Sequence, residues 1–332
     1  MIKYLGRCTR WSSIIIMAKL FIIGNGFDLA HGMETKYSDF RQFLIDNYLN
    51  GEYMPYTFCD VPQATLMPDG DEQYNDVDVV KSILKVLDDT EGVDWNEVED
   101  SLGCLQYSHF LDDYGEYNPE DDNYIRDTYC RNQDFSKQLC GAICQINNYF
   151  QEWVKTIKIA TTPKKEFMEL ISPQNDLFLN FNYTSTLQDL YNIKKVCHIH
   201  GTVNDKIYFG HGESYCPSEE YEKYWFGAEY SLKRLFFDLR KNAKEAFNKH
   251  KGFFNELCVI ACNSTLDIYS YGFSFSRADK YYLKEICSII NTSNIRFFIN
   301  DYDDEFKRKH FTDTLLECGF KGTISSFHIE EK

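Results

Sequence analysis

The chain has 332 residues, of which 43% are hydrophobic and 26% charged, a balance typical of a globular protein and not of a disordered or fibrous one. Its formal net charge of −16 argues against nucleic-acid binding, because an acidic surface repels a phosphate backbone. The 12 cysteines include no Cys-x-x-Cys pair, so we expect free thiols, a reducing cytoplasmic location and no zinc ribbon.

The N-terminal residues contain one short apolar run, Ile14–Ile16. This run is too short to span a bilayer, and no small-residue cleavage site follows it. A second methionine, Met17, stands directly before the first clear strand pattern. We therefore expect no membrane segment, and we interpret residues 1–16 as a non-native or disordered extension.

The next part of the chain begins with a strand and becomes mostly helical. The apolar run Leu20–Ile23 ends at Gly24 and predicts a buried strand. Helical spacing then starts at Ser38, the expected N-cap. Residues of about 50–170 are interpreted as a mostly helical insertion. Within it, helices are expected at 79–87, 95–102 and 124–157, and loops at 50–75 and 112–122.

Strands and helices alternate in the rest of the chain. Such units predict a parallel sheet covered by helices on both faces, because each crossover returns over the sheet. The expected fold is therefore a single Rossmann-like α/β domain over residues 17–332 that carries the helical insertion. The predicted strands are 177–181, 196–200, 207–209, 266–271, 295–299 and 323–327; the predicted helices are 185–191, 230–262, 277–290 and one ending at Leu316.

One group of basic residues falls within the predicted helix 230–262. The pattern favours a solvated helix face over a binding site. The group is Lys233, Arg234, Arg240, Lys241 and Lys244.

Parallel sheets bind ligands at the carboxyl ends of their strands, and polar or glycine residues follow four of the predicted strands. The first group is Gly24-Asn25-Gly26, with a later glycine at Gly32. Glycines let the backbone approach a phosphate or ribose with amides directed at the ligand. A plain strand–helix turn is the alternative.

The second group, Asn180 to Thr184, contains Asn182, whose amide is able to orient a water or a ribose hydroxyl. The alternative is that an asparagine of this group caps the helix that follows.

The third group is His198-Ile199-His200-Gly201. Residues two apart on a strand share a face, so both imidazoles are expected near one pocket. A less favoured alternative is a zinc site built from Cys197, His198, His200 and His211.

The fourth group runs from Ser270 to Ser276, with Asp279 soon after. It is interpreted as a second turn that lines the pocket. A strand end with Ser276 capping the next helix is the alternative.

Several of these segments, taken in order, resemble the phage abortive-infection family AbiH. The resemblance runs from about Met17 to the end of the chain. Its motifs are Leu20 to Gly32, Thr35 with Tyr37 to Phe40, Trp95 with Glu99, Asn180 to Thr184, His198 to Gly201, Phe209 to Gly212, and Gly272 to Asp279.

AbiH in turn is similar to the sirtuin-like superfamily, a Rossmann-type fold that binds NAD. The resemblance implies cleavage of the nicotinamide–ribose bond, with Asn182 and His200 as the catalytic residues and NAD as the substrate. No metal is expected. The resemblance implies a nucleotide-binding role for Gly24, Asn25, Gly26, Asp28, Gly32, Asp39, Tyr183, Gly201, His211, Gly272, Ser274 and Asp279.

This chain also departs from the sirtuin pattern. Thr184 stands where sirtuins have Asp, and the zinc-ribbon cysteines are absent, which argues against a protein deacylase. Asp39-Phe40-Arg41 resembles a sirtuin motif but lies later in the chain, and Phe273 stands where relatives often have His.

The favoured hypothesis is a phage-defence effector that hydrolyses NAD or a related nucleotide. The first alternative is a nucleotide-binding sensor or scaffold without catalysis, and the second is a metal-dependent nuclease that uses the histidines. Expected partners are the nucleotide and a phage trigger, with no nucleic acid and no membrane. A homo-oligomer is compatible with the sequence.

Overall fold

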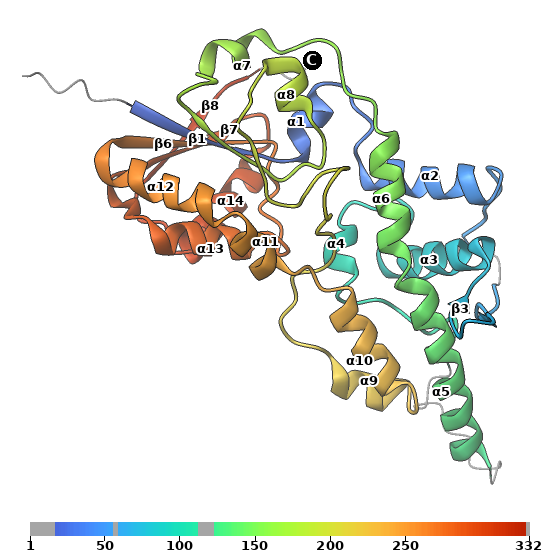
Figure 1. The fold of residues 1–332 in the computed structure, drawn as a ribbon. Coiled ribbons are helices and arrows are strands. Elements are labelled where there is room, and N and C mark those ends of the chain that lie inside the picture. Colours follow the sequence, from blue (N-terminus) through green and yellow to red (C-terminus); the bar gives the residue numbers. More distant parts are fainter. Residues whose placement is uncertain (1–16, 56–58, 112–122, 330–332) are drawn as a thin grey trace, which may run out of the picture.

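A six-stranded parallel sheet forms one half of the fold, where Figure 1 labels β1, β6, β7 and β8; the complete strand order is β5–β4–β1–β6–β7–β8. The structure is a computed structural model that describes residues 17–55, 59–111 and 123–329. The parallel sheet with helices around it confirms the Rossmann-like α/β fold. Its strands are β1 (Met17–Ile23), β4 (Leu177–Asn180), β5 (Cys197–His198), β6 (Thr265–Tyr271), β7 (Arg296–Asn300) and β8 (Thr323–Phe327).

Both faces of the sheet are buried, which explains why the central strands have continuous apolar runs. Leu20 and Ile22 of β1 face one layer of helices, and Phe21 and Ile23 face the other. Each such side chain contributes about 1.5–3 kcal/mol when fully buried. One face is covered by α1 (Asn25–Ala30), α7 (Lys165–Leu170) and α8 (Thr186–Tyr191), and the other by α11 (Ala243–Lys249), α12 (Lys251–Asn263), α13 (Lys280–Ile289) and α14 (Glu305–Glu317).

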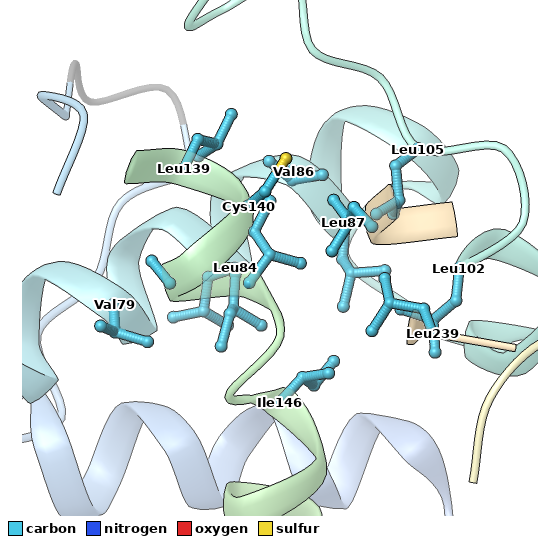
Figure 2. Packing of buried hydrophobic residues seen from close by; sticks show 14 of the residues in the cluster. Val79, Leu84, Val86, Leu87, Leu102, Leu105, Leu139, Cys140, Ile146 and Leu239 are labelled. Atoms are coloured by element: carbon cyan, nitrogen blue, oxygen red, sulfur yellow. The ribbon is translucent and has the colours of Figure 1, made fainter. Parts of the chain in front are cut away.

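The remaining helices form a separate layer beside the carboxyl edge of the sheet, which we call the helical body (Figure 1). Its own apolar core includes Val79, Leu87, Leu102, Leu139 and Leu239 (Figure 2). This core draws on the 50–170 segment and also on helices before and after it. The helical body consists of α2 (Tyr37–Tyr48), α3 (Asp76–Glu91), α4 (Val98–Ser101), α5 (Tyr124–Ile143), α6 (Ile146–Thr156), α9 (Ser218–Tyr224) and α10 (Glu229–Asp238), with a small hairpin of β2 (Thr65–Leu66) and β3 (Glu72–Gln73).

The helical body reaches the sheet through aromatic rings. Phe150 of α6 stacks on Phe209 with ring centroids 3.9 Å apart and contacts Tyr183 edge-on at 5.2 Å. Tyr183 follows β4 and Phe209 follows β5, so the segments beyond these two strands are packed between the sheet and the helical body.

Some predicted boundaries in the helical body were wrong. Helix α2 begins at Tyr37 with Lys36 as N-cap instead of Ser38, because Asp39 accepts a hydrogen bond from the Lys36 N–H at 2.8 Å. The predicted helix 124–157 is two helices, α5 and α6. Helix α4 covers only part of 95–102, since Trp95 has a φ of 44°.

Two predictions for segments nearer the sheet were also wrong. Segment 207–209 is not a strand; the N–H of Tyr208 instead donates to the His200 carbonyl at 2.9 Å. The predicted helix 230–262 is divided into α10, α11 and α12. The expected extension at 1–16 and loop at 112–122 lie outside the described residues.

Two further features can be stated for the described part of the chain. Its cysteines are free thiols. None of its helices is both long enough and apolar enough to cross a membrane.

Candidate functional site

The turns that follow β1 and β6 touch each other at the carboxyl edge of the sheet. The N–H groups of Gly24 and Gly26 donate to the carbonyls of Tyr271 and Gly272, at 3.0 and 2.9 Å. A Cβ on Gly24 would lie 2.5 Å from the Gly272 oxygen, so no larger residue fits there. These glycines allow the two turns to meet, and these two amides are therefore not directed at a ligand.

A buried polar network surrounds Asp28, on the face covered by α1 and α8. Thr184 and Thr186 donate to the Asp28 carboxylate at 2.5 and 2.8 Å. The amide of Asn182 donates to the Gly24 carbonyl at 3.0 Å and also bonds to Asp28. Burial raises the pKa of Asp28 to about 6, although these hydrogen bonds act in the opposite direction.

A second buried network surrounds His200, which follows β5. His200 Nε2 lies 3.0 Å from Asp279 Oδ1. The Lys241 ammonium lies 3.1 Å from the same carboxylate oxygen, 2.8 Å from Glu99 Oε1 and 3.5 Å from His200 Nε2. Tyr37 also hydrogen-bonds to Glu99. We call His200, Asp279, Lys241 and Glu99 the buried charge cluster; the four residues are between 3% and 8% exposed.

The electrostatics of this cluster are those of close ion pairs between buried side chains. Burial alone would raise the pKa of Asp279, but Lys241 and His200 outweigh it and hold this pKa well below its usual range. Burial opposes the charge on Lys241, yet Asp279 and Glu99 raise its pKa. For Tyr37, burial and then Glu99 and Asp279 raise the pKa of the phenol well above its usual value. The cluster therefore holds ionised carboxylates and an ammonium away from water.

The segment before α11 places Lys241 in the cluster. The N–H of Lys241 donates to the His211 carbonyl, and the N–H of His211 donates to the Leu239 carbonyl, at 2.9 and 3.1 Å. The His211 ring is held by the Phe236 carbonyl and the Glu213 N–H. Both ring nitrogens of His211, a predicted nucleotide-binding residue, are thus bonded to backbone groups, those of Phe236 and Glu213.

The other predicted binding residues occupy different positions around this edge. Asn25, Gly32 and Ser274 are exposed, and Gly26 and Gly272 are half-buried. Asp39 lies in the first turn of α2 and accepts a hydrogen bond from the N–H of the N-cap, Lys36. The remaining two lie next to His200: the Tyr183 ring is 5.9 Å from the imidazole, and Gly201 has a φ of 83° with the Lys206 carbonyl against it.

Asn182 and His200, the two predicted catalytic residues, follow neighbouring strands and reach the same edge of the sheet. Their side chains, however, join different networks. The imidazole of His200 contacts the rings of Phe181 and Tyr183, the residues on either side of Asn182. The two residues therefore lie on neighbouring segments at one edge of the sheet. Their polar groups, however, belong to the two separate networks described above.

The zinc alternative is not supported by the positions of its residues. His198 bonds to Gln188 and to the Asn182 carbonyl, while His200 and His211 have the partners given above. Throughout the described ranges, no group of three or more His, Cys, Asp or Glu side chains is arranged to hold a metal ion.

Two candidate residues escaped the sequence analysis. Lys241 was interpreted there as part of a solvated helix face, but its side chain is fully buried. The signal for a break before α11 was present, because Asn242 and Glu245 have capping-box spacing and the Asn242 side chain accepts from the Glu245 N–H. Asn300 ends β7, and both polar atoms of its amide are buried without a hydrogen-bond partner. The strand-end rule applied to β7 would have identified it.

A cleft of about 500 Å³ is lined by residues that neighbour the cluster residues in sequence. Asp100 and Ser101, next to Glu99 in sequence, line the cleft, and so does Arg277, two residues before Asp279. Burial raises the pKa of Asp100, with Glu97 and Glu99 adding to the effect.

Fold and site together define a Rossmann-like α/β protein with polar networks at the carboxyl edge of its sheet and a helical body over that edge. This architecture agrees with a comparison at the level of sequence. The chain belongs to the bacteriophage abortive infection AbiH family, which matches residues 20–301. No curated protein and no solved structure matches the chain.

Proposed function

We propose that this AbiH protein is a phage-defence effector that hydrolyses NAD, or a related nucleotide, at the nicotinamide–ribose bond, using a sirtuin-like version of the Rossmann-type fold. The observation that carries this proposal is the His200–Asp279 pair, buried at the carboxyl edge of the sheet with 3.0 Å between Nε2 and Oδ1. A histidine oriented by a carboxylate is an arrangement suited to accept a proton near neutral pH.

In the proposed reaction, the bond between the ribose C1′ and the nicotinamide nitrogen breaks. Its electron pair moves to the ring nitrogen and neutralises the pyridinium charge. A water oxygen bonds to C1′ and gives up one proton, which His200 accepts. The products are nicotinamide and the ADP-ribose moiety, and the proton passes from His200 to solvent.

The Asp279 carboxylate would determine which imidazole nitrogen acts. When Nε2 carries a proton it donates to Asp279, and Nδ1 is then the nitrogen that accepts the proton from water. Asn182 would contribute its amide oxygen, because its amide nitrogen is engaged by the Gly24 carbonyl. An acceptor at that position suits a ribose hydroxyl or the attacking water.

The glycine turns and Asn300 would hold the nucleotide. The half-buried Gly26 and Gly272 and the exposed Asn25 and Ser274 form an accessible rim where β1 meets β6. An open sheet of this kind binds ligands where its strand order reverses, which here is beside β1. The unpartnered Asn300 amide offers both a donor and an acceptor at the end of the strand beside β6.

A nucleotide-binding sensor without catalysis is a second candidate. One observation favours it: the Asn182 amide is already engaged by the fold, which limits its freedom to orient a water. Tight nucleotide binding without turnover, both with and without the trigger, would distinguish this candidate.

The direct test incubates purified protein with NAD, alone and with an extract of phage-infected cells, and measures released nicotinamide. The wild type should release it, and Asn182→Ala and His200→Ala should each lower the rate about 100-fold or more. His310→Ala, at an exposed site on α14, is the matched control. Unchanged rates in both site variants would refute the assigned roles.

A further inference from the structure

The buried charge cluster joins the sheet to the helical body. Asp279 and His200 belong to the sheet side, since Asp279 precedes α13 and His200 follows β5. Glu99 comes from α4 in the helical body. Lys241 bonds to carboxylates from both sides, at 2.8 Å from Glu99 and 3.1 Å from Asp279.

The charges in the cluster do not balance. Glu99 and Asp279 supply two negative charges and Lys241 one positive charge, so the cluster has a net charge of −1 when His200 is neutral. Protonation of His200 makes the cluster neutral. Because every member is buried, these charges are weakly screened by water and act strongly on the imidazole.

We propose that Lys241 and Glu99 are positioning residues that act through the charge they place at the pair: Glu99 of the helical body fixes the Lys241 ammonium beside Asp279 and His200, and this ammonium lowers the proton affinity of the imidazole. This inference rests on the proposed function for its catalytic meaning, but its structural core concerns four residues and is testable without turnover.

The groups that face His200 come from several elements. Lys241 and Asp279 contact it directly, and the rings of Tyr183 and Tyr282 lie 5.9 and 5.6 Å away. Glu99 acts through Lys241. Burial, together with Asp279 and Glu99, raises the pKa of Tyr282 far above its usual range, so this phenol stays neutral. The charges of Lys241, Asp279 and Glu99 therefore dominate the field at the imidazole.

The test is the pH titration of the His200 imidazole by NMR in the full chain labelled at histidine, with the signal assigned by its loss in His200→Gln. Lys241→Met removes a positive charge, so the imidazole should titrate at a higher pH than in the wild type, by roughly one pH unit. Glu99→Gln removes a negative charge and should shift the midpoint the other way. The controls Lys244→Met and Glu97→Gln alter exposed residues nearby in the chain and should leave it in place.

Opposite shifts in the two variants would support the inference, because a general loss of packing would not produce shifts of opposite sign. Shifts of the same sign, or none, would overturn it. If Lys241→Met fails to fold, the nearly isosteric Glu99→Gln is the test by itself: a lower titration midpoint supports the inference, and an unchanged or higher midpoint overturns it.

Turnover measured on the same variants separates this inference from the proposed function. If the wild type releases nicotinamide, Lys241→Met should lower kcat roughly tenfold with little change in KM. If the wild type has no turnover but the opposite shifts are seen, the proposed reaction fails and the positioning of His200 stands.

Discussion

Gly24 and Gly272 lie so close that a Cβ on Gly24 would be 2.5 Å from the Gly272 carbonyl oxygen. The contact joins the turns after β1 and β6, the two strands at the centre of the sheet. The glycine-rich turn therefore has a structural role that precedes any contact with a ligand.

Replacing Gly272 with alanine should destabilise the fold. Gly272 has a φ of 67°, and an added Cβ would lie 2.1 Å from the Phe27 nitrogen, so backbone strain and a clash combine. The expected loss is about 2–4 kcal/mol, measured by denaturant unfolding. Gly319→Ala isolates the strain, because Gly319 has a φ of 92° with no atom within 4 Å. Equal losses in the two variants would contradict the proposed close contact.

Because of Asp28, the free energy of unfolding should fall as pH rises from about 4 to about 6. Burial raises its pKa from 3.8 to about 6 in the folded state, so the folded chain retains a proton that the unfolded chain releases in this window. The separation corresponds to about 3 kcal/mol.

The measurement is the free energy of unfolding at pH 4 and pH 6.5 in wild type and in Asp28→Asn. The wild type should lose more stability across this range than the variant. Asp189→Asn, which changes an exposed carboxylate on α8, should behave like the wild type. The same pH dependence in wild type and Asp28→Asn would contradict the raised pKa.

Removing Lys241 and Glu99 together should cost less stability than the sum of the two single effects. Lys241→Met leaves Glu99 without a cation and Asp279 with His200 alone, and should cost about 3–5 kcal/mol. Adding Glu99→Gln removes one unpaired carboxylate, so the double variant should be more stable than the sum of the single effects predicts. A double-mutant cycle in denaturant measures the coupling, and strict additivity would show that the two residues do not interact.

Asn300 offers a prediction in which stability and binding move in opposite directions. Its amide is buried without partners, so Asn300→Leu should leave the protein without nucleotide as stable as the wild type or more so. The same variant should lose the rise in Tm that NAD produces in the wild type. Wild-type stabilisation by NAD in Asn300→Leu would remove this residue from the nucleotide site.

The central strands were predictable because burial on both faces leaves continuous apolar runs, as in Leu20–Ile23. The turn glycines were recognisable for a related reason, since only glycine fits where β1 and β6 meet. The short β5 was harder. It pairs with β4 at Leu179 and Asn180 only, and Tyr208 then bonds to the His200 carbonyl in place of forming a strand.

The buried charge cluster was not predictable as a unit, because its members come from four distant segments. Lys241 was hidden by the neighbouring basic residues, which do lie on exposed helix faces at Lys233, Arg234 and Lys244. The capping signal at Asn242 predicts a break in the helix, but the inward position of Lys241 depends on the tertiary pairing of Arg240 with His211. Periodicity describes single elements, whereas this pairing depends on contacts between them.

The central claim is that His200 takes part in NAD hydrolysis when a phage infects the cell. Cellular NAD, measured through a time course of infection, tests it most directly in cells that carry the wild type, His200→Ala or the exposed-site control His310→Ala. We predict that NAD falls in the wild type and the control and stays level in His200→Ala. An equal fall in His200→Ala, or a level NAD pool in protected wild-type cells, would contradict the account.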